Sequence, residues 1–184
     1  KLWVFKFLLY MIFVENLINH VVTLLFEKSD CVYQGTTLDF KTPFQCFTLK
    51  EAVLNHHKTL TESHFMQKET LKAYLSEHAI FFQPDDELGH LQLALFEKTV
   101  EHRLIQPTFI THYPTEVSPL ARRSQSDPSV TDRFELFVAG REIANGFSEL
   151  NDPIDQAKRF WDQMKKKEAG ENEAMVYDQE YIEA

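Results

Sequence analysis

Three glutamates recur every seven residues in the last third of the chain, at Glu135, Glu142 and Glu149. They lie in two runs in which apolar and polar residues alternate, 134–138 and 141–150. Two such runs around a short glycine-containing joint predict a β-hairpin. Carboxylates spaced along a sheet surface can hold a hard cation or a cationic substrate. The stretch therefore predicts an acidic site on a hairpin.

The register of this hairpin follows from its joint. A two-residue loop at Ala139–Gly140 places Phe137 opposite Glu142. It also places Glu135 opposite Ala144. Because side chains alternate with period two, the first two glutamates become diagonal neighbours on one face, about 7–8 Å apart at their Cα atoms. Carboxylates this close repel unless a cation or proton lies between them. Mg²⁺ bound by one or two carboxylates plus substrate phosphates suits that geometry.

Three further residues of the second run, Asn145, Phe147 and Glu149, share a face with one another. An ideal pleat puts that face opposite to Glu142. A β-bulge near Ala144–Gly146 would bring all of them to one side. The alternative is that the glutamates form the solvent-exposed side of a half-buried strand and have no further role.

Composition limits the classes of protein that remain. The 184 residues are 43% hydrophobic and 13% aromatic, which predicts a globular domain with a sizeable core. A formal net charge of −9 argues against a broad surface for nucleic acid. The two cysteines, Cys31 and Cys46, form no CxxC motif, which favours a reducing cytoplasmic location.

Two longer strings identify a family. GREIANGFSELNDPIDQAKRF and the upstream PTFITHYPTEVSPLARR closely resemble the catalytic domain of class II lysyl-tRNA synthetases. The resemblance runs from about Glu15 to Ala184 and is strongest over Leu104–Phe160. It implies an α+β fold in which an antiparallel sheet is flanked by helices. We therefore divide the chain into an apolar segment, 1–13, that does not match the family and a partial catalytic domain, 14–184.

The resemblance also implies roles. Class II lysyl-tRNA synthetases activate lysine with ATP and Mg²⁺ and then transfer it to tRNA(Lys). Residue by residue, Glu135 and Glu142 fall on the family's ligands for ATP-bound magnesium. Asn145, Phe147 and Glu149 fall on the lysine pocket, where the last faces the substrate ammonium. A carboxylate pairs well with a compact ammonium, and an aromatic wall packs on the aliphatic stem of lysine.

The chain departs from the family at three motifs. The F-R-x-E string of motif 2, the glycine-rich motif 3 with its arginine, and motif 1, which forms the homodimer interface, do not occur. We therefore expect a lysine–tRNA ligase piece that is inactive by itself. Two alternatives stay open: a non-catalytic fragment or interaction module, and the synthetase paralogue that lysylates a translation factor. The strings EVSPLARR and FSELND favour the true synthetase.

The elements that position the site can be read from periodicity. We expect a strand at 107–112, the hairpin at 134–150, a β segment at 31–40 that turns at Gln34–Gly35, and a connector at 41–47. Thr48 and Glu51 form a capping-box pattern. Helices are expected at 14–27, 48–57, 67–79, 88–104 and 153–167.

Residues 2–26 are strongly apolar and allow two interpretations. One is a membrane span. The other, which we favour, is a buried strand or helix followed by an amphipathic helix, because charged and polar residues interrupt the stretch. Those residues are Lys6, Glu15, Asn16, Asn19 and His20. No membrane association is therefore expected.

Two pairs of side chains outside the hairpin allow more than one interpretation. Arg122 and Arg123 lie in a long polar loop, 118–132, where they could meet a phosphate or a carboxylate, or could simply be solvated. His56 and His57 could bind a metal, but no cluster of partner ligands accompanies them in the sequence, so we interpret them as surface residues.

Overall fold

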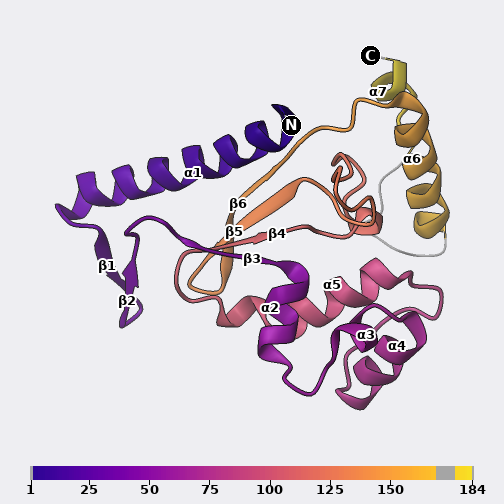
Figure 1. The fold of residues 1–184 in the computed structure, drawn as a ribbon, viewed down its shortest axis with the longest axis horizontal. Helices are drawn as coiled ribbons and strands as arrows, with labels where there is room; N and C mark the ends of the chain where they lie inside the picture. Colours follow the sequence, from indigo (N-terminus) through magenta and orange to yellow (C-terminus); the bar gives the residue numbers. More distant parts are fainter. Residues whose placement is uncertain (1, 169–176, 184) are drawn as a thin grey trace.

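A four-stranded sheet is the centre of the fold (Figure 1). The computed structural model describes residues 2–168 and 177–183. Helix α1 covers one face of the sheet, and α2 and α5 pack on the other. The strand order is β3 (Gln45–Thr48), β4 (Thr108–Thr111), β5 (Arg133–Val138) and β6 (Arg141–Phe147). The predicted α+β class is confirmed.

Strand β3 corrects one prediction. β4, β5 and β6 are antiparallel as expected, but β3 pairs with β4 in parallel, in the stretch we interpreted as a connector. Parallel neighbours need a long crossover, and here α2, α3, α4 and α5 provide it. The strand has four residues, of which Gln45 and Cys46 are exposed, so its periodicity signal is weak.

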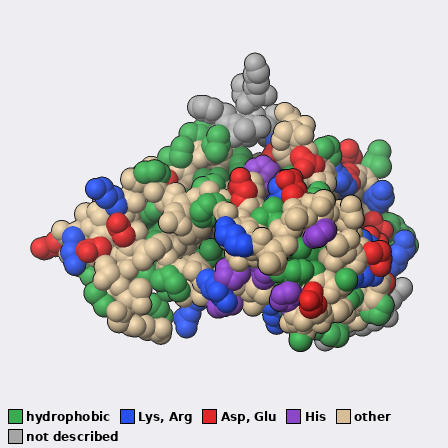
Figure 2. Space-filling view, turned by 60° about the horizontal axis from the view of Figure 1, so that its bottom comes forward, with side chains coloured by type: hydrophobic (Ala, Val, Ile, Leu, Met, Phe, Trp, Pro, Cys, Tyr) green, Lys and Arg blue, Asp and Glu red, His purple; other side chains and the backbone are tan. Residues whose placement is uncertain are grey.

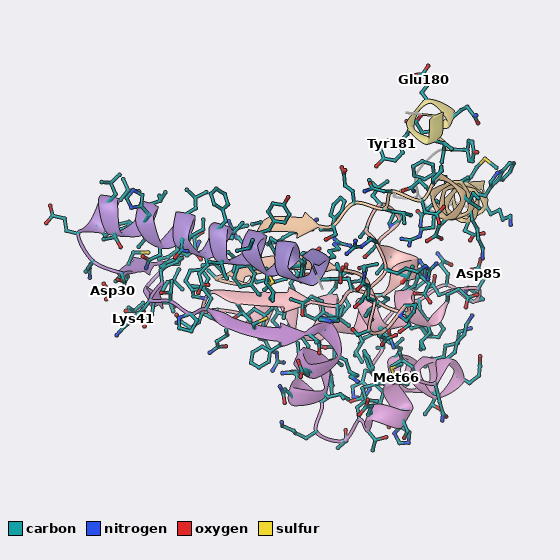
Figure 3. The ribbon with its side chains drawn as sticks, turned by 45° about the horizontal axis from the view of Figure 1, so that its top comes forward. Asp30, Lys41, Met66, Asp85, Glu180 and Tyr181 are labelled. Atoms are coloured by element: carbon teal, nitrogen blue, oxygen red, sulfur yellow. The ribbon has the colours of Figure 1, made fainter. Side chains whose placement is uncertain are left out.

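Helix α1 (Leu2–Phe26) is continuous, so the prediction of two separate elements is wrong. One stripe of the helix docks on the sheet: Phe7, Met11 and Val22 are buried, and the Phe7 ring lies 5.8 Å from that of Phe134. Within residues 7–26, many of the other apolar side chains are exposed and not buried as expected. Figure 3 shows side chains projecting outward from it. The exposed apolar residues are Leu8, Leu9, Tyr10, Ile12, Phe13, Leu17, Val21, Leu24, Leu25 and Phe26.

Polar residues of α1 fasten it to the chain that follows. Glu15 Oε1 accepts a hydrogen bond from the Phe44 amide at 2.5 Å, and Asn19 Nδ2 donates to the Phe40 carbonyl at 2.7 Å. By length and composition, the Phe7–Phe26 stretch could also cross a membrane. A core helix of a soluble protein or a signal sequence passes the same test. The two hydrogen bonds explain why polar residues occur in an apolar helix.

Most other helices confirm their predictions to within a few residues. Figure 2 shows acidic and basic side chains mixed over the face that α2 to α5 contribute to, with histidines gathered near its centre. Thr48 and Glu51 form the predicted capping box. The predicted 88–104 helix ends early, at Thr99, and α3 was not predicted. The helices are α2 (Leu49–His56), α3 (Glu62–Phe65), α4 (Lys68–Glu77), α5 (Leu88–Thr99), α6 (Pro153–Glu168) and α7 (Gln179–Glu183), with 3₁₀ turns at Glu101–Arg103 and Thr115–Val117.

A separate hairpin lies beside α1. It consists of β1 (Asp30–Tyr33) and β2 (Thr36–Asp39) and turns at Gln34–Gly35 as predicted. Both turn residues have positive φ, at 49° and 81°, which is the backbone that two-residue hairpin loops need. At the other end of the molecule, α7 packs on α6 through Tyr181, whose ring lies 5.7 Å from that of Phe160 (Figure 3).

The β5–β6 hairpin has the predicted two-residue loop and a bulge. Ala139 and Gly140 have φ of 54° and 69°. Phe137 pairs with Glu142 as predicted, but the register then shifts and leaves Ile143 without a partner. Glu135 consequently pairs with Asn145 and not with Ala144.

Gly146 is not the site of this bulge. It pairs regularly with Phe134, and a Cβ at this glycine would come within 2.6 Å of the Phe134 ring. The glycine therefore makes room for an aromatic ring that is packed in the core beneath α1.

Candidate functional site

The bulge brings four of the five predicted site residues, Glu135, Glu142, Asn145 and Phe147, to one face of the hairpin. Directly paired residues of antiparallel strands project to the same side. The pairs on this side are Arg133 with Phe147, Glu135 with Asn145, and Phe137 with Glu142. One extra residue between Glu142 and Asn145 changes the alternation, as the single-face hypothesis requires.

Glu135 is buried, and both of its carboxylate oxygens are engaged. Tyr113 Oη donates to Oε2 at 2.6 Å, and the Arg133 guanidinium donates to Oε1. Burial raises the pKa of Tyr113, and the negative charge of Glu135 raises that pKa further, so the phenol is a neutral donor. A buried carboxylate is stable only when charge and hydrogen bonds compensate for lost water, and these two partners provide both.

Arg133 connects Glu135 on β5 to Asn145 on β6. Its Nη1 donates to the Val117 carbonyl and to Ser118 Oγ, each at 3.1 Å. Its Nε donates to Asn145 Oδ1 at 3.4 Å. The guanidinium is therefore held by the loop after β4 and by both strands of the hairpin.

Glu142 and Glu101 complete an acidic surface beside Glu135. Burial raises the pKa of Glu142, the charge of Glu135 raises it further, and Arg133 opposes both effects. Burial and Glu135 also raise the pKa of Glu101, which lies in the 3₁₀ turn after α5. Mutual repulsion of this kind is relieved by a cation.

The donor set fits a cation that is completed by substrate. Within residues 2–168 and 177–183, no group of three or more His, Cys, Asp or Glu side chains could hold a metal ion by itself. Mg²⁺ commonly takes one or two protein carboxylates and completes its shell with water and substrate phosphates. Glu135 and Glu142 are of the type and number that such a site requires.

A cavity of about 370 Å³ adjoins Arg133. Its volume lies in the range of about 300–1,000 Å³ that small-molecule sites occupy. Asn145 and Phe147, which the resemblance assigns to a lysine pocket, are among the residues that line it. The other lining residues are His90, Leu93, Glu116, Val117, Ser118, Pro119, Leu120, Ala121, Arg133 and Gln163.

Glu149 is placed differently from its two companions. It is exposed, forms an isolated bridge with Ala121 beyond the end of β6, and is absent from the described residues that line the cavity. The expectation that its side chain opens into the same cavity as Asn145 and Phe147 is therefore corrected.

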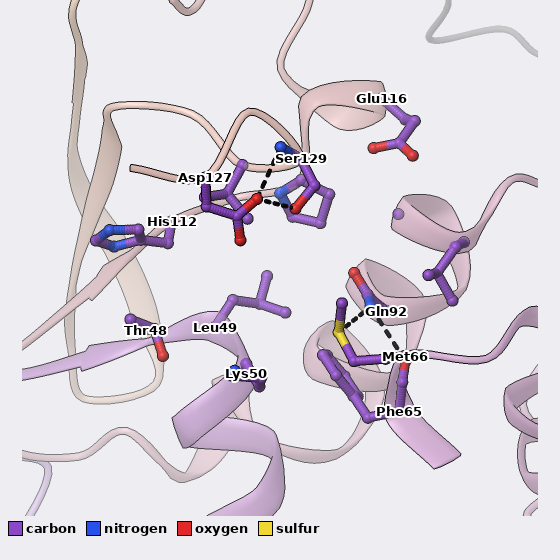
Figure 4. A pocket seen from close by; sticks show the side chains of 14 residues that line it. Thr48, Leu49, Lys50, Phe65, Met66, Gln92, His112, Glu116, Asp127 and Ser129 are labelled. Atoms are coloured by element: carbon purple, nitrogen blue, oxygen red, sulfur yellow. Dashed lines mark hydrogen bonds between the residues drawn. The ribbon is translucent and has the colours of Figure 1, made fainter. Parts of the chain in front are cut away.

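A smaller cavity of about 170 Å³ lies between the start of α2, α3, α5 and the loop after β4 (Figure 4). Asp127 accepts from Ser129 Oγ at 2.6 Å and Gln92 donates to the Phe65 carbonyl at 3.1 Å, so its polar groups bond to one another. Glu116 lines this cavity as well as the larger one. A Cβ on Gly89 would come within 2.7 Å of the Glu116 carboxylate.

Both arginines of the 118–132 loop are partly buried and have carboxylate partners. Arg122 pairs with Asp132 at 2.9 Å, and Arg123 pairs with Asp155 of α6 at 3.2 Å. Arg159 of α6 donates to the Ala121 carbonyl at 2.6 Å. The sequence left open whether Arg122 and Arg123 meet a phosphate, a carboxylate or solvent, and the structure shows a carboxylate for each.

His57 also differs from its interpretation as a surface residue. It is half-buried, with Nδ1 3.0 Å from Tyr74 Oη and Nε2 2.7 Å from Thr99 Oγ1. Because Thr99 Oγ1 donates to the Leu95 carbonyl, the hydroxyl must accept from His57. Nε2 therefore carries the proton, and Nδ1 accepts from Tyr74.

Three residues of the site were missed from the sequence. Arg133 lies two residues before Glu135, so the alternation that selected the glutamates also places it on their face. Tyr113 gave no such signal, because His112 adopts a φ of 58° and breaks the alternation after β4. Glu101 lies in a 3₁₀ turn that we expected to be the last turn of a helix.

Comparison with known proteins agrees with this geometry. A family model described as tRNA synthetases class II (D, K and N) matches residues 7–184. A lysine–tRNA ligase of Legionella pneumophila (strain Corby) is 50% identical over 172 residues, which cover 94% of this chain and 35% of the relative.

Two further relatives carry the same name. The lysine–tRNA ligase of Thiobacillus denitrificans is 48% identical and covers 94% of this chain and 34% of the relative. That of Aeromonas salmonicida is 52% identical over 151 residues, 82% of this chain and 30% of the relative. The chain thus spans about a third of the length of these relatives, and the resemblance stated from the sequence is confirmed.

Proposed function

Because the chain belongs to the family of class II tRNA synthetases (D, K and N), we propose that it forms the part of a lysine–tRNA ligase catalytic domain that binds lysine and Mg²⁺–ATP. The observation that carries the proposal is the bulged β5–β6 hairpin. It gathers Glu135, Glu142, Asn145 and Phe147 on one face, beside a cavity of ligand size. Names of relatives that are about half identical support the choice of lysine as substrate.

Each residue has a proposed role. Glu135 and Glu142 supply carboxylate oxygens to the magnesium that accompanies ATP. Bound Mg²⁺ neutralises phosphate charge while lysine is activated. Asn145 and Phe147 shape the lysine pocket, where the aromatic ring packs on the aliphatic stem. Glu149 pairs with the substrate ammonium, and it must turn toward the cavity to do so.

The proposal extends to the whole ligase of which this chain resembles a third. In such an enzyme the partners are lysine, ATP and tRNA(Lys), the assembly is a homodimer, and the location is the cytoplasm. We expect no membrane association, because Glu15 and Asn19 of α1 are engaged by the chain that follows. By itself, the 184-residue chain is proposed to be catalytically inactive.

The test is a ligand titration followed by NMR on the labelled chain. Lysine should shift the amide resonances of Asn145, Phe147 and their neighbours, and norleucine, which lacks the side-chain ammonium, should shift them less. The variant Glu149→Gln should remove the difference between the two ligands, and Glu27→Gln, remote from the hairpin, should preserve it. If norleucine and lysine act equally on the unchanged chain, the proposal that the pocket selects lysine is wrong.

A further inference from the structure

The Glu135 carboxylate, proposed to bind a metal ion, already faces the positive charge of Arg133. The Arg133 guanidinium donates to Oε1, while Tyr113 Oη donates to Oε2 at 2.6 Å. Both members of the ion pair are largely buried, with side-chain exposures of 18% for Arg133 and 9% for Glu135. A divalent ion reaching this carboxylate therefore meets a positive charge that is already in place.

Arg133 is fixed in that position by more than its partner carboxylate. The Val117 carbonyl, Ser118 Oγ and Asn145 Oδ1 accept from its other nitrogens at 3.1, 3.1 and 3.4 Å. Its Cζ lies 4.6 Å from the centroid of the Tyr113 ring. A planar guanidinium with several fixed donors suits such a multidentate position, and a lysine would not reproduce it.

We infer that Arg133 is the resident counter-ion of Glu135 and that a divalent cation shared by Glu135 and Glu142 must compete with its guanidinium. The identity of the cation as magnesium rests on the proposed function. The competition rests only on the contacts of Arg133. Binding of a divalent ion therefore weakens the Arg133–Glu135 contact, and Arg133 limits the affinity of the site when substrate is absent.

Removing Arg133, the buried partner of Glu135, should improve cation binding. Two positive charges near one carboxylate repel each other. A charge within about 4–6 Å shifts the pKa of a carboxyl group by roughly 1–3 units, and we expect an effect of similar size on cation affinity. In Arg133→Gln, Mn²⁺ used as the probe should bind roughly tenfold or more tightly than to the unchanged chain. Arg133→Lys keeps the positive charge but loses the planar guanidinium with its several donors, so it should show a smaller gain.

Stability provides the second readout. Arg133→Gln leaves a buried carboxylate without its counter-charge, so the variant should unfold at a lower temperature than the unchanged chain. Mn²⁺ should restore part of the loss, and NaCl of equal ionic strength should not. The double variant Arg133→Gln/Glu135→Gln has no buried charge to compensate and should show no rescue by Mn²⁺.

The experiment is a Mn²⁺ titration followed by electron paramagnetic resonance and by thermal unfolding at pH 7.5. Arg141→Gln is the matched control, because Arg141 lies on the same hairpin but is exposed, and it should leave Mn²⁺ affinity unchanged. Equal or weaker Mn²⁺ binding in Arg133→Gln, or undiminished rescue in the double variant, overturns the inference. If Arg133→Gln does not fold, Mn²⁺ affinity in Arg133→Lys decides, since no gain there also contradicts competition. Neither lysine nor ATP is present, so a failed lysine titration leaves this result unaffected.

Discussion

The Arg133 guanidinium lies over the ring of Tyr113, with 4.6 Å between Cζ and the ring centroid, and both side chains donate to the carboxylate of Glu135. The face of the Tyr113 ring contacts the guanidinium, and the Tyr113 hydroxyl donates to Oε2 of Glu135. The arrangement stabilises a charge that would otherwise be costly inside the protein. It also connects β5 to the segment after β4 that carries Tyr113, Val117 and Ser118.

Replacing Tyr113 by phenylalanine should therefore destabilise the fold. The change removes one hydrogen bond to a buried charged group, for which the expected loss is about 1.5–3 kcal/mol of unfolding free energy. Urea unfolding at pH 7 measures it. Tyr10→Phe is the control, because Tyr10 is 55% exposed on α1 and should change stability by less than about 0.5 kcal/mol. Equal effects of the two substitutions would contradict the role of the phenol.

Gly140, in the loop of the β5–β6 hairpin, and Gly35, in the β1–β2 hairpin, differ in the space available for a Cβ atom. Comparing alanine substitutions at the two positions therefore separates backbone strain from steric clash. A Cβ on Gly140 would lie 2.9 Å from the His102 carbonyl oxygen, and the residue has a φ of 69°. Gly35 has a comparable φ of 81° but no atom within 4 Å of the added Cβ. Gly35→Ala should cost about 1–2 kcal/mol through backbone strain alone, and Gly140→Ala should cost clearly more. Denaturant unfolding of both variants checks the order, and a smaller cost at Gly140 contradicts it.

Local patterns predicted much of the hairpin. The alternation, the two-residue loop and the need for a bulge all follow from residues 134–150, because strand pairing and turn chemistry are local. The position of the bulge does not. Glycine inside a strand often marks a bulge, which pointed to Gly146. The extra residue of the bulge is instead Ile143. Gly146 serves instead the ring of Phe134, which depends on packing beneath α1.

Long-range pairing explains the other failures. β3 forms its parallel ladder with a strand that follows some sixty residues later, and its own four residues contain little alternation. Tyr113 reaches Glu135 because His112 turns the chain with a φ of 58°, a conformation that the sequence did not signal. Helix α1 is apolar on nearly all sides, so periodicity could not select the stripe that docks.

The docking stripe of α1 can be tested with neighbouring residues. Met11 is 7% exposed and packs in the core against the sheet, whereas Phe13 is 65% exposed. Met11→Gln should destabilise the chain by about 2 kcal/mol or more, since it buries a polar group without a partner. Phe13→Gln should remain within about 0.5 kcal/mol. Thermal or urea unfolding measures both, and the reverse order would show that another face of the helix docks.

His57 should make stability fall in mild acid. Burial lowers its pKa from 6.5 to about 4, and the positive charges of His56, His78 and Arg103 contribute. A lowered folded-state pKa means that the unfolded chain binds the proton first, so the contribution of His57 is complete above pH 6.5 and is lost as the pH falls toward 4. The loss should be on the order of 1–2 kcal/mol once partial exposure of the ring is discounted.

The measurement is the unfolding free energy between pH 7.5 and 4 for the unchanged chain and for His57→Gln. The variant should have a shallower dependence on pH. His64→Gln, at an exposed histidine, should retain the dependence of the unchanged chain. A direct check is the NMR titration of the His57 ring, whose midpoint near pH 6.5 would falsify the argument.

The 184-residue chain by itself should not catalyse lysine activation. Neither the F-R-x-E arginine of motif 2 nor the arginine of motif 3 occurs in its sequence, and its glycines, at positions 35, 89, 140, 146 and 170, cannot form the G-x-G-x-G segment. Removing one preorganised donor to a developing charge commonly lowers a rate by about 10²–10³. Loss of two such groups should therefore bring lysine-dependent exchange of pyrophosphate into ATP below detection.

Binding should be less affected than catalysis, because the hairpin face is present. Lysine is expected to shift the NMR resonances of the hairpin at millimolar concentration, while ATP binding should be poor without the arginines that hold its phosphates. An assay of pyrophosphate exchange with and without lysine shows whether the chain catalyses lysine activation or only binds lysine. Exchange that depends on lysine and is lost in Glu142→Gln would show that the chain completes a catalytic site by itself. Exchange that persists in Glu142→Gln would come from a contaminating synthetase and would leave the expectation intact.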